Sequence, residues 1–480
     1  IMKHKFIYIA TLLGGLIAFS SCDDFLTHEL EDGYNNDTFY KTEDDALKSI
    51  SGAYNALSFT SAQNRLWVFG DVASDDAVKG GSDGDGSEIA GIDDFSANSS
   101  NGMISEYWQH TYEAVNRANE VLKYVPGISM DETLKKRILA EAKFIRAYSY
   151  FKLTNIWGRI PLRQEPIDKP SNLHVPLSDV SAVYALIEKD LKEAVPSLNR
   201  SYTGEDVGRI TKGAAWGLLA KAYLYQKKYG DCLSAIDSLE NLNVYSLTET
   251  YADLFKMGAE DNAEVIFAVR HLSNQNPGLG NVLNVWLAPQ QESGYYFDAP
   301  TQSYVDSFDE KTIDNADDPR LDASIGRDGQ PWMNGSTFSA SWSSTGYLVR
   351  KHQQPFSEVE QGRKADGNLP YIYIRYADIL LMKAEALNED NKTSLAQDEI
   401  NKVRNRAKLA DINTSDQTTM RLAIQKERRR ELGFEFHRFF DLMRWGKDVA
   451  EAALGSKFTW QEPRFYFPLP QAEIDSNNAI

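Results

Sequence analysis

The sequence predicts a mainly α-helical protein: a scaffold of helical hairpins that carries a large, irregular, loop-rich portion and a few short strands. Apolar residues recur at helical spacing through much of residues 103–160, one hairpin spacing occurs twice, and the long stretches between helices show little periodicity. We expect a single domain over residues 41–480. Its helical scaffold would cover about 41–60, 103–160, 178–260 and 371–447, and its loop-rich part about 61–102 and 270–370.

The first residues have the layout of a secretory signal. Met2 to Lys5 form a short basic start, Phe6 to Phe19 are almost wholly apolar, and Ser20 and Ser21 stand just before Cys22. The apolar run is well short of the ~20 residues that a membrane-spanning helix needs, and no other stretch approaches that length. We therefore expect no membrane-spanning segment.

Cys22 directly follows the small residues, as in bacterial lipoprotein precursors, which this start resembles although Phe19 replaces the usual leucine. The resemblance implies that the Cys22 sulfur is lipidated and the chain is cut in front of it. Residues 1–21 would then be a signal peptide and residues 22–40 a lipidated tether. The alternative is an ordinary secreted protein whose Cys22 is removed or unpaired.

Charge and cysteine usage exclude several classes of protein. The formal charge of −18 becomes −20 when Lys3 and Lys5 leave with the signal, and so acidic a chain is a poor candidate for binding nucleic acid or anionic membrane surfaces. After lipidation of Cys22, Cys232 would be the only thiol. Stability must therefore come from a hydrophobic core and not from a disulfide scaffold.

Two amphipathic helices are predicted between residues 103 and 160. The first carries Trp108, Tyr112 and other apolar residues along one face and stops at Pro126-Gly127. A capping box, Ser129 to Glu132, should start the second, which runs to Gly158 and has a wide apolar stripe. We expect this second helix to be covered on two sides.

A helical hairpin spacing occurs twice. In the first copy Ala220 lies in one helix and Cys232 in the next, with a turn around Gly230. The repeated positions are Ala220, Cys232, Ile236 and Leu239 in the first copy and Ala384, Ala396, Ile400 and Val403 in the second. This spacing is similar to the tetratricopeptide pattern of about 34 residues, in which small residues let paired helices approach closely. Cys232 is therefore predicted to be a core residue and not a nucleophile.

The stretches between the helices are irregular. Residues 80–101 form a Gly/Ser/Asp-rich loop, and residues 273–370 are rich in Asn, Gly, Pro, Ser and aromatics. Residues 263–272 and 345–352 contain β-formers in partial alternation, which predicts short strands there. Loops this long in a compact protein are usually functional.

The order of these pieces along the whole presumed mature chain resembles the SusD/RagB family, the surface glycan-binding lipoproteins of Bacteroidota. The matching stretches include "YWQHTYEAVNRANEVL", "LAEAKFIRAYSYFKLTNIWGRIPL", "YIYIRYADILLMKAEAL", "KERRRELGFEFHRFFDLMRWGK" and "FYFPLPQAEI". The resemblance implies a lipid-anchored protein on the outer face of the outer membrane. It also implies a partner, a SusC-like TonB-dependent transporter, to which captured oligosaccharide or polysaccharide is delivered for import.

Aromatic residues in irregular stretches are the candidate glycan-binding residues. A sugar ring has apolar faces and a rim of hydroxyl groups, so it needs flat aromatic platforms and a few polar groups. In the family, ligand aromatics come from the zone before the Trp108 helix and from the long central insertion. The candidates here are Trp67, Trp286, Tyr295, Tyr296, Trp332 and Trp342. Arg65, Asp75 and Asp76 flank Trp67 and could bind hydroxyls, although solvated loop charges are the alternative.

Other chemistry has little support in the sequence. Asp83, Asp85 and Glu88 lack the ligand spacing of a calcium loop, and the histidines lack zinc-site spacing, so we expect no metal, no cofactor and no catalytic residue. The run Arg428 to Arg430, interleaved with glutamates, predicts an ion-pair lattice within one helix.

Two other functions remain open at this point. One is a peptide- or protein-binding helical scaffold, because tetratricopeptide hairpins commonly bind peptides. The other is a glycoside hydrolase, since a cleaving carboxylate pair has no linear signature. The identity of the glycan is not encoded in any linear motif.

Overall fold

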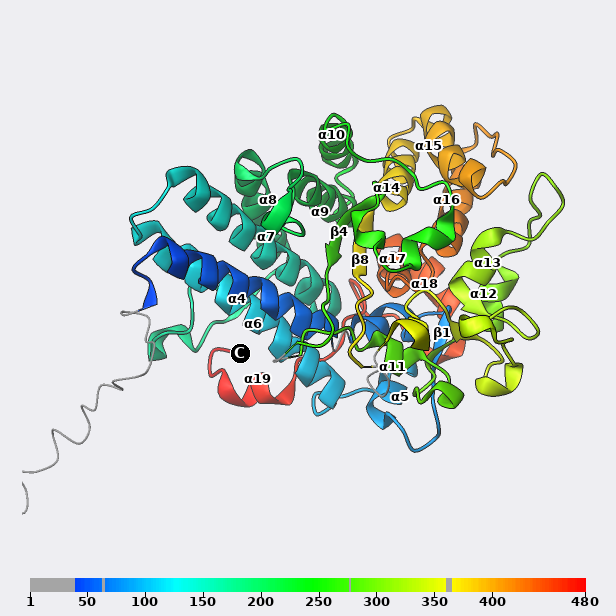
Figure 1. Ribbon diagram of the computed structural model, residues 1–480, viewed down its shortest axis with the longest axis horizontal. Coiled ribbons are helices and arrows are strands. Elements are labelled where there is room, and N and C mark those ends of the chain that lie inside the picture. Colours follow the sequence, from blue (N-terminus) through cyan, green and yellow to red (C-terminus); the bar gives the residue numbers. More distant parts are fainter. Residues whose placement is uncertain (1–38, 63–64, 276–277, 360–364) are drawn as a thin grey trace, which may run out of the picture.

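The computed structural model describes residues 39–62, 65–275, 278–359 and 365–480 (Figure 1). The predicted signal peptide, Cys22 and most of the predicted tether lie outside these residues. The described chain begins against the scaffold, where the rings of Tyr40 and Tyr124 stack with centroids 4.7 Å apart. In the described ranges, no helix combines the length and the apolar character needed to cross a membrane.

The scaffold consists of long helices in which each packs on the next along the chain. Figure 1 shows them following one another across one side of the molecule. These helices are α4 (Glu43–Ala62), α6 (Gly102–Tyr124), α7 (Glu132–Trp157), α8 (Val180–Ala194), α9 (Lys212–Tyr225), α10 (Tyr229–Glu240), α14 (Tyr376–Glu389), α15 (Thr393–Arg406) and α16 (Gln417–Leu432). The predicted mainly α-helical fold class is confirmed.

Shorter helices and strands make up the rest. The helices are α5 (Ser87–Asp93), α11 (Leu283–Leu287), α12 (Gln302–Asp306), α13 (Pro319–Ser324), α17 (Arg438–Trp445), α18 (Lys447–Leu454) and α19 (Gln471–Ser476). The strands form four antiparallel pairs: β1 (Ala77–Gly80) with β5 (Phe297–Pro300), β2 (Ile160–Pro161) with β3 (Leu177–Ser178), β4 (Val265–Val269) with β8 (Tyr371–Arg375), and β6 (Ile325–Gly326) with β7 (Leu348–Val349).

Both predicted short strands exist, as β4 and β7. Two expectations were incomplete: α5 interrupts the region predicted as a loop over residues 80–101, and β8 occupies the start of the segment assigned to the helical scaffold. The sequence does not separate β8 from α14, because α14 follows β8 directly and both segments are rich in apolar residues.

The repeated hairpin is confirmed. α9 and α10 form one copy and α14 and α15 the other, and the four predicted positions of each copy are buried. Cys232 is fully buried, and burial raises the pKa of its thiol far above the ordinary value. A thiol of this kind is a core residue, because the reactive thiolate is strongly disfavoured.

Helix α7 is the most enclosed element of the scaffold. Every residue from Phe144 to Trp157 is buried, which confirms that the helix is covered on two sides. The predicted capping box is wrong: Asp131 is the N-cap, and its Oδ1 accepts a hydrogen bond from the Leu134 amide at 2.8 Å. Ser129 stands two residues too early to reach the first free amides.

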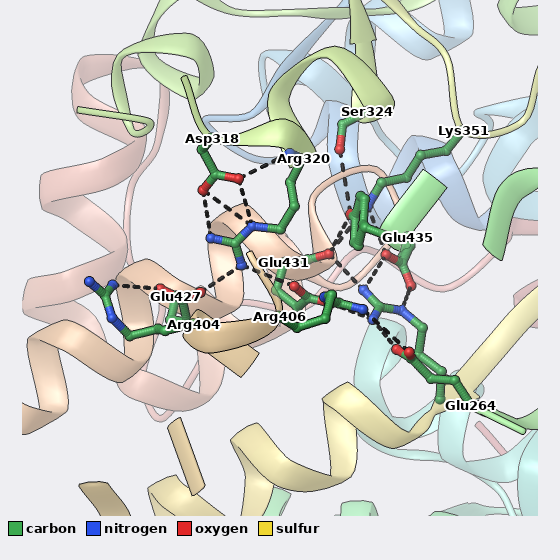
Figure 2. Close-up of polar contacts among 12 residues, drawn as sticks. Glu264, Asp318, Arg320, Ser324, Lys351, Arg404, Arg406, Glu427, Glu431 and Glu435 are labelled. Atoms are coloured by element: carbon green, nitrogen blue, oxygen red, sulfur yellow. Dashed lines mark hydrogen bonds and ion pairs between the residues drawn. The ribbon is translucent and has the colours of Figure 1, made fainter. Parts of the chain in front are cut away.

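A buried ion network joins the loop-rich part to the scaffold (Figure 2). Arg375 at the end of β8 contacts Glu264 and Glu435, each at 2.8 Å. Arg320 of α13 contacts Glu427 of α16 at 2.6 Å. The carboxylates of this network are Glu264, Asp318, Glu427, Glu431 and Glu435, and its cations are Arg320, Lys351, Arg375, Arg404 and Arg406. Among these buried groups the two sets are equal in number, and Arg404 also contacts the partly exposed Glu310 at 2.6 Å.

The run Arg428 to Arg430 is confirmed as ion-paired, but its expected partners were wrong. Arg428 pairs with Asp378 of α14 at 2.9 Å and with Asp441 of α17 at 3.1 Å. Glu427, Glu431 and Glu435 stand at helical spacing around these arginines in the sequence. In the described structure, however, all three arginines pair with carboxylates outside α16. Their role is therefore tertiary.

Candidate functional site

The structure brings three predicted site residues together: Arg65, Trp286 and Tyr295. α11 carries Trp286, and the centroids of the Trp286 and Tyr295 rings are 5.0 Å apart at an interplanar angle of 36°. The Arg65 guanidinium lies 4.7 Å from the centroid of the Trp286 ring. Phe297 of β5 adds a ring nearly parallel to Tyr295, at 4° and 5.8 Å. We call these four residues the aromatic platform.

A short loop between α11 and β5 fixes Tyr295 beside Trp286. The Tyr295 amide donates to the Val285 carbonyl, and the Tyr296 amide donates to the Ala288 carbonyl, both at 2.9 Å. Gly294 is required in this loop because a Cβ there would lie 2.1 Å from the Ala288 carbonyl oxygen. Tyr295 can therefore remain 43% exposed while its backbone is held in place.

The base of the platform is built by close approach of two glycines to Phe297. β1 and β5 pair with Gly80 opposite Phe297. A Cβ at Gly81, which has a φ of +67°, would lie 2.4 Å from Cε1 of the Phe297 ring. Only a glycine accommodates both this backbone conformation and the ring above it.

Trp67 belongs to the support of the platform. It was predicted to be exposed, and this is wrong: the side chain is fully buried just before the π-helical turn η1 (Val68–Val72). Its indole stacks on Phe297 with centroids 6.0 Å apart at 21°. Trp67 is buried although its sequence neighbourhood is irregular, because Phe297 of β5, 230 residues later in the chain, packs against it.

Polar groups lie beside the aromatic faces. Arg65 donates from Nε to Glu106 Oε2 at 3.3 Å, so its guanidinium is oriented by Glu106 on one side and the Trp286 ring on the other. A flat apolar face next to an oriented donor and an acceptor suits a ligand with apolar ring faces and hydroxyl groups. Neither Glu106 nor Phe297 was among the predicted site residues. Glu106 had no linear signal, whereas Phe297 stood next to Tyr295 and Tyr296.

Asp75 and Asp76 have a structural role instead of facing a ligand. Asp75 contacts Arg438 at 2.8 Å and Arg429 at 3.0 Å, and Asp76 contacts Arg429 at 2.5 Å. Burial opposes ionisation of Asp75, but Arg438 and Arg429 outweigh it and hold its pKa below the ordinary value. For Asp76 burial prevails, and its pKa is raised. The expectation that they bind hydroxyls finds no support, because arginines already occupy these carboxylates.

The remaining predicted aromatics form a separate small cluster. Trp332 is only 4% exposed, packs on Phe338 with ring centroids 5.2 Å apart, and donates from Nε1 to Glu292 at 2.9 Å. Trp342 also packs on Phe338, with ring centroids 5.3 Å apart, and Trp342 and Tyr296 are partly buried against the same cluster. Trp332 therefore has little free face for stacking, whereas Tyr296 and Trp342 remain partly exposed.

A second surface was considered as the site. A cavity of about 660 Å³ lies between α6 and α19. Its aromatic lining residues are the buried Trp108 and the partly exposed Tyr112. Four of its charged groups are paired, Arg117 with Glu113 at 2.6 Å and Arg163 with Glu473 at 3.1 Å. The aromatic platform is therefore the stronger candidate, since it offers an exposed ring.

The fold and the platform define a mainly α-helical hairpin scaffold whose candidate site is carried by inserted loops. A model of the SusD family matches residues 263–459, and a model described as "Starch-binding associating with outer membrane" matches residues 33–224. A solved structure, "Laminarin binding SusD-like protein", superimposes with a TM-score of 0.79 at 30% identity, covering 91% of this chain and 98% of that one. The chain belongs to the SusD/RagB family.

Other relatives agree with this assignment. "SusD-like protein P25" of Formosa agariphila is 27% identical over 478 residues, covering 89% of this chain and 87% of the relative. A "SusD-like protein" of Bacteroides ovatus is 28% identical and covers 94% and 84%. The crystal structure of a SusD superfamily protein from Bacteroides vulgatus shares the fold at a TM-score of 0.81 and 24% identity, covering 92% and 98%.

Proposed function

We propose that this protein binds oligosaccharides at the aromatic platform, on the outer face of the outer membrane, and delivers them to a SusC-like TonB-dependent transporter. The observation that carries the binding step is the exposed Tyr295 ring, backed by Phe297 and Trp286 and flanked by the oriented Arg65. The similar solved protein is described as laminarin-binding. This makes a β-glucan such as laminarin the first ligand to test.

The binding step is tested by calorimetry. Laminarin, starch, a fructan and a plant hemicellulose are titrated into the wild-type protein, Tyr295→Ala and Leu422→Ala. Leu422 is a control because it is an exposed apolar residue on α16, 61% exposed. We expect Tyr295→Ala to weaken binding of the preferred glycan by roughly tenfold, or ~1.4 kcal/mol, and Leu422→Ala to leave it unchanged. Unchanged binding by Tyr295→Ala would remove the platform as the site.

The delivery step and the absence of catalysis need separate measurements. The wild-type protein should co-purify with a SusC-like transporter from detergent-solubilised outer membranes, and it should release no shorter product from the bound glycan. Product release by the pure protein would favour a glycoside hydrolase. Failure to co-purify would leave glycan binding standing and reject the delivery step alone.

A further inference from the structure

A cavity of about 640 Å³ in the loop-rich part is not used by the proposed function. It is lined by α13, by the residues that follow β7, and by the short 3₁₀ turns η6 (Tyr251–Phe255), η9 (Met333–Gly335) and η11 (Phe356–Glu358). Its volume is in the range of small-molecule sites, roughly 300–1,000 Å³. It shares no lining residue with the aromatic platform, so it is a separate candidate site.

The wall of this cavity is mainly apolar. Met257 and Met333 contribute flexible side chains that adapt to the shape of a ligand, and Met257 is 42% exposed. The aromatic residue in the described wall is Phe255. The Lys351 ammonium lies 4.8 Å from the centroid of its ring, and Tyr251 packs edge-on against it at 5.2 Å. The wall therefore suits an apolar body better than a sugar ring, which needs a flat and open aromatic face.

Arg350 is a cation in this wall that has no carboxylate partner among the described residues. Its Nη1 donates to the carbonyl oxygens of Asp322 at 3.1 Å and Pro331 at 3.0 Å, and these two bonds orient the guanidinium. Nε and Nη2 donate to no described group. The side chain is half-buried, and neither nitrogen is among the enclosed polar atoms that lack a partner, so both are accessible. Burial lowers the pKa of Arg350, with Asp322 opposing the shift, and an anion in the cavity would offset this cost of burial.

The two free nitrogens form the fork that binds a carboxylate through two parallel hydrogen bonds. This protein uses the same fork elsewhere. Arg327 holds Asp322 through Nε at 2.6 Å and Nη2 at 2.9 Å. Arg421 holds Glu389 through the same two atoms at 2.6 Å and 2.8 Å. At Arg350 the fork is open toward the cavity that this residue lines, so a ligand can supply the carboxylate.

The other polar groups of the cavity do not fill this role. Lys256 is paired with Asp253 at 2.5 Å, and the Asp322 carboxylate is occupied by an arginine. Glu358 is exposed and has no ion partner in the part of the chain that the structure describes. Water screens such a charge, so Glu358 would oppose a bound acid only weakly. The amide atoms of Gln353 are enclosed, and we assign them no ligand contact.

We propose that this cavity binds an organic acid with an apolar body, whose carboxylate accepts hydrogen bonds from Nε and Nη2 of Arg350 and whose body lies against the methionines of the wall. The bidentate contact would give selectivity for the acid, and the apolar wall would supply the remaining affinity. This site does not depend on glycan binding at the aromatic platform.

The proposal is tested by ¹⁹F NMR titration with 4-(4-fluorophenyl)butanoate and, as its uncharged match, 4-(4-fluorophenyl)butan-1-ol. We expect the wild-type protein to bind the acid at least about tenfold more tightly than the alcohol, and Arg350→Gln to bind the two equally. Glu358→Gln should keep or increase the preference for the acid, because it removes a like charge. The control Lys447→Gln, an exposed cation at the start of α18, should change neither affinity by more than about twofold.

A second variant covers the case in which Arg350→Gln unfolds through loss of its two carbonyl contacts. Met257→Glu places a like charge on an exposed wall residue, so the fold should be kept and the acid should bind at least about tenfold more weakly. Equal binding of acid and alcohol by the wild type would overturn the proposal. Unchanged acid binding by Met257→Glu, weaker acid binding by Glu358→Gln, or a preference for the acid that survives in folded Arg350→Gln would do the same. Displacement of the acid by laminarin would place it at the aromatic platform and would also reject the cavity.

Discussion

Glu431 tests whether the buried ion network holds the loop-rich part on the scaffold. Its fully buried carboxylate contacts Arg375 at 2.5 Å, Arg320 at 3.0 Å, and Arg406 (Figure 2). Burial would raise the pKa of Glu431, but Arg406, Arg375 and Arg320 outweigh it and hold the pKa well below the ordinary value. Glu431→Gln keeps the shape of the side chain, removes its charge and turns one accepting oxygen into an NH2 donor that faces an arginine.

The expected loss follows from the charge balance of the network. The substitution leaves five buried cations against four carboxylates. Removing one partner of a buried ion pair costs about 3–5 kcal/mol, because the other charge stays buried without compensation. We expect the loss of unfolding free energy for Glu431→Gln to fall within this range and not above it, because Arg320 and Arg375 retain Asp318 and Glu264 as partners. A depressed carboxylate pKa contributes stability that is present above the unfolded pKa and is lost as pH falls through the folded pKa.

Urea unfolding of wild type, Glu431→Gln and the control Glu451→Gln, measured from pH 7 down to pH 3, checks this reasoning. Glu451 is exposed on α18, and we expect it to change the free energy of unfolding by less than about 0.5 kcal/mol. The difference between wild type and Glu431→Gln should be full at pH 7 and should shrink only below the unfolded pKa, about 4.3. A loss below 1 kcal/mol at pH 7, or a difference that does not shrink in acid, would refute the assigned role.

Three further predictions follow from single residues. Burial and then Asp76 raise the pKa of Asp298, whose carboxylate oxygens lack partners among the described residues, so ionisation of Asp298 lowers the stability of the fold above pH ~4. Asp298→Asn should therefore stabilise the protein at pH 7 by at least about 1 kcal/mol, with no gain at pH 3.5, as measured by thermal melting; destabilisation at pH 7 would contradict this. Gly294→Ala should lower the unfolding free energy by about 1–3 kcal/mol and weaken glycan binding, because the new Cβ meets the Ala288 carbonyl; unchanged binding in calorimetry would separate the loop from the site. If Cys22 carries the expected acyl chains, these would bind the protein to the membrane, so Cys22→Ala should move the protein from the membrane fraction to the medium or periplasm; retention in the membrane fraction would mean that a partner binds it there.

Local sequence determined the parts of the fold that could be predicted. The positions of Ala220 and Cys232, three and four residues from their apolar neighbours, define hairpin faces without knowledge of any distant segment. The start of α7 at Glu132 was predicted correctly, but its N-cap was assigned to Ser129 because two capping signals, Ser129 and Asp131, stand two residues apart. Only the observed hydrogen bond to Leu134 distinguishes them.

The sequence predicted the kind of residue that forms the candidate site, but not which of the loop aromatics lie in it. Tyr295 and Trp286 are close in sequence, so a single loop brings them together. Trp67 has the same kind of flanking residues, yet it is buried, because its neighbour in space is Phe297. Flanking composition reports whether a segment is irregular, and it does not report which irregular segments pack on one another.

The charged residues that seemed suited to a ligand instead position the loops that carry the platform. Arg429, in α16, pairs with Asp75 and Asp76, which lie between η1 and β1. The same helix carries Glu431, whose partner Arg320 belongs to the central insertion. Both zones of the loop-rich part are thus connected to one helix by buried charges. Stacking on an exposed ring needs little charge but a fixed ring position. In the proposed function the aromatic residues would therefore contact the glycan, and the ion pairs would hold the loops that carry them in place.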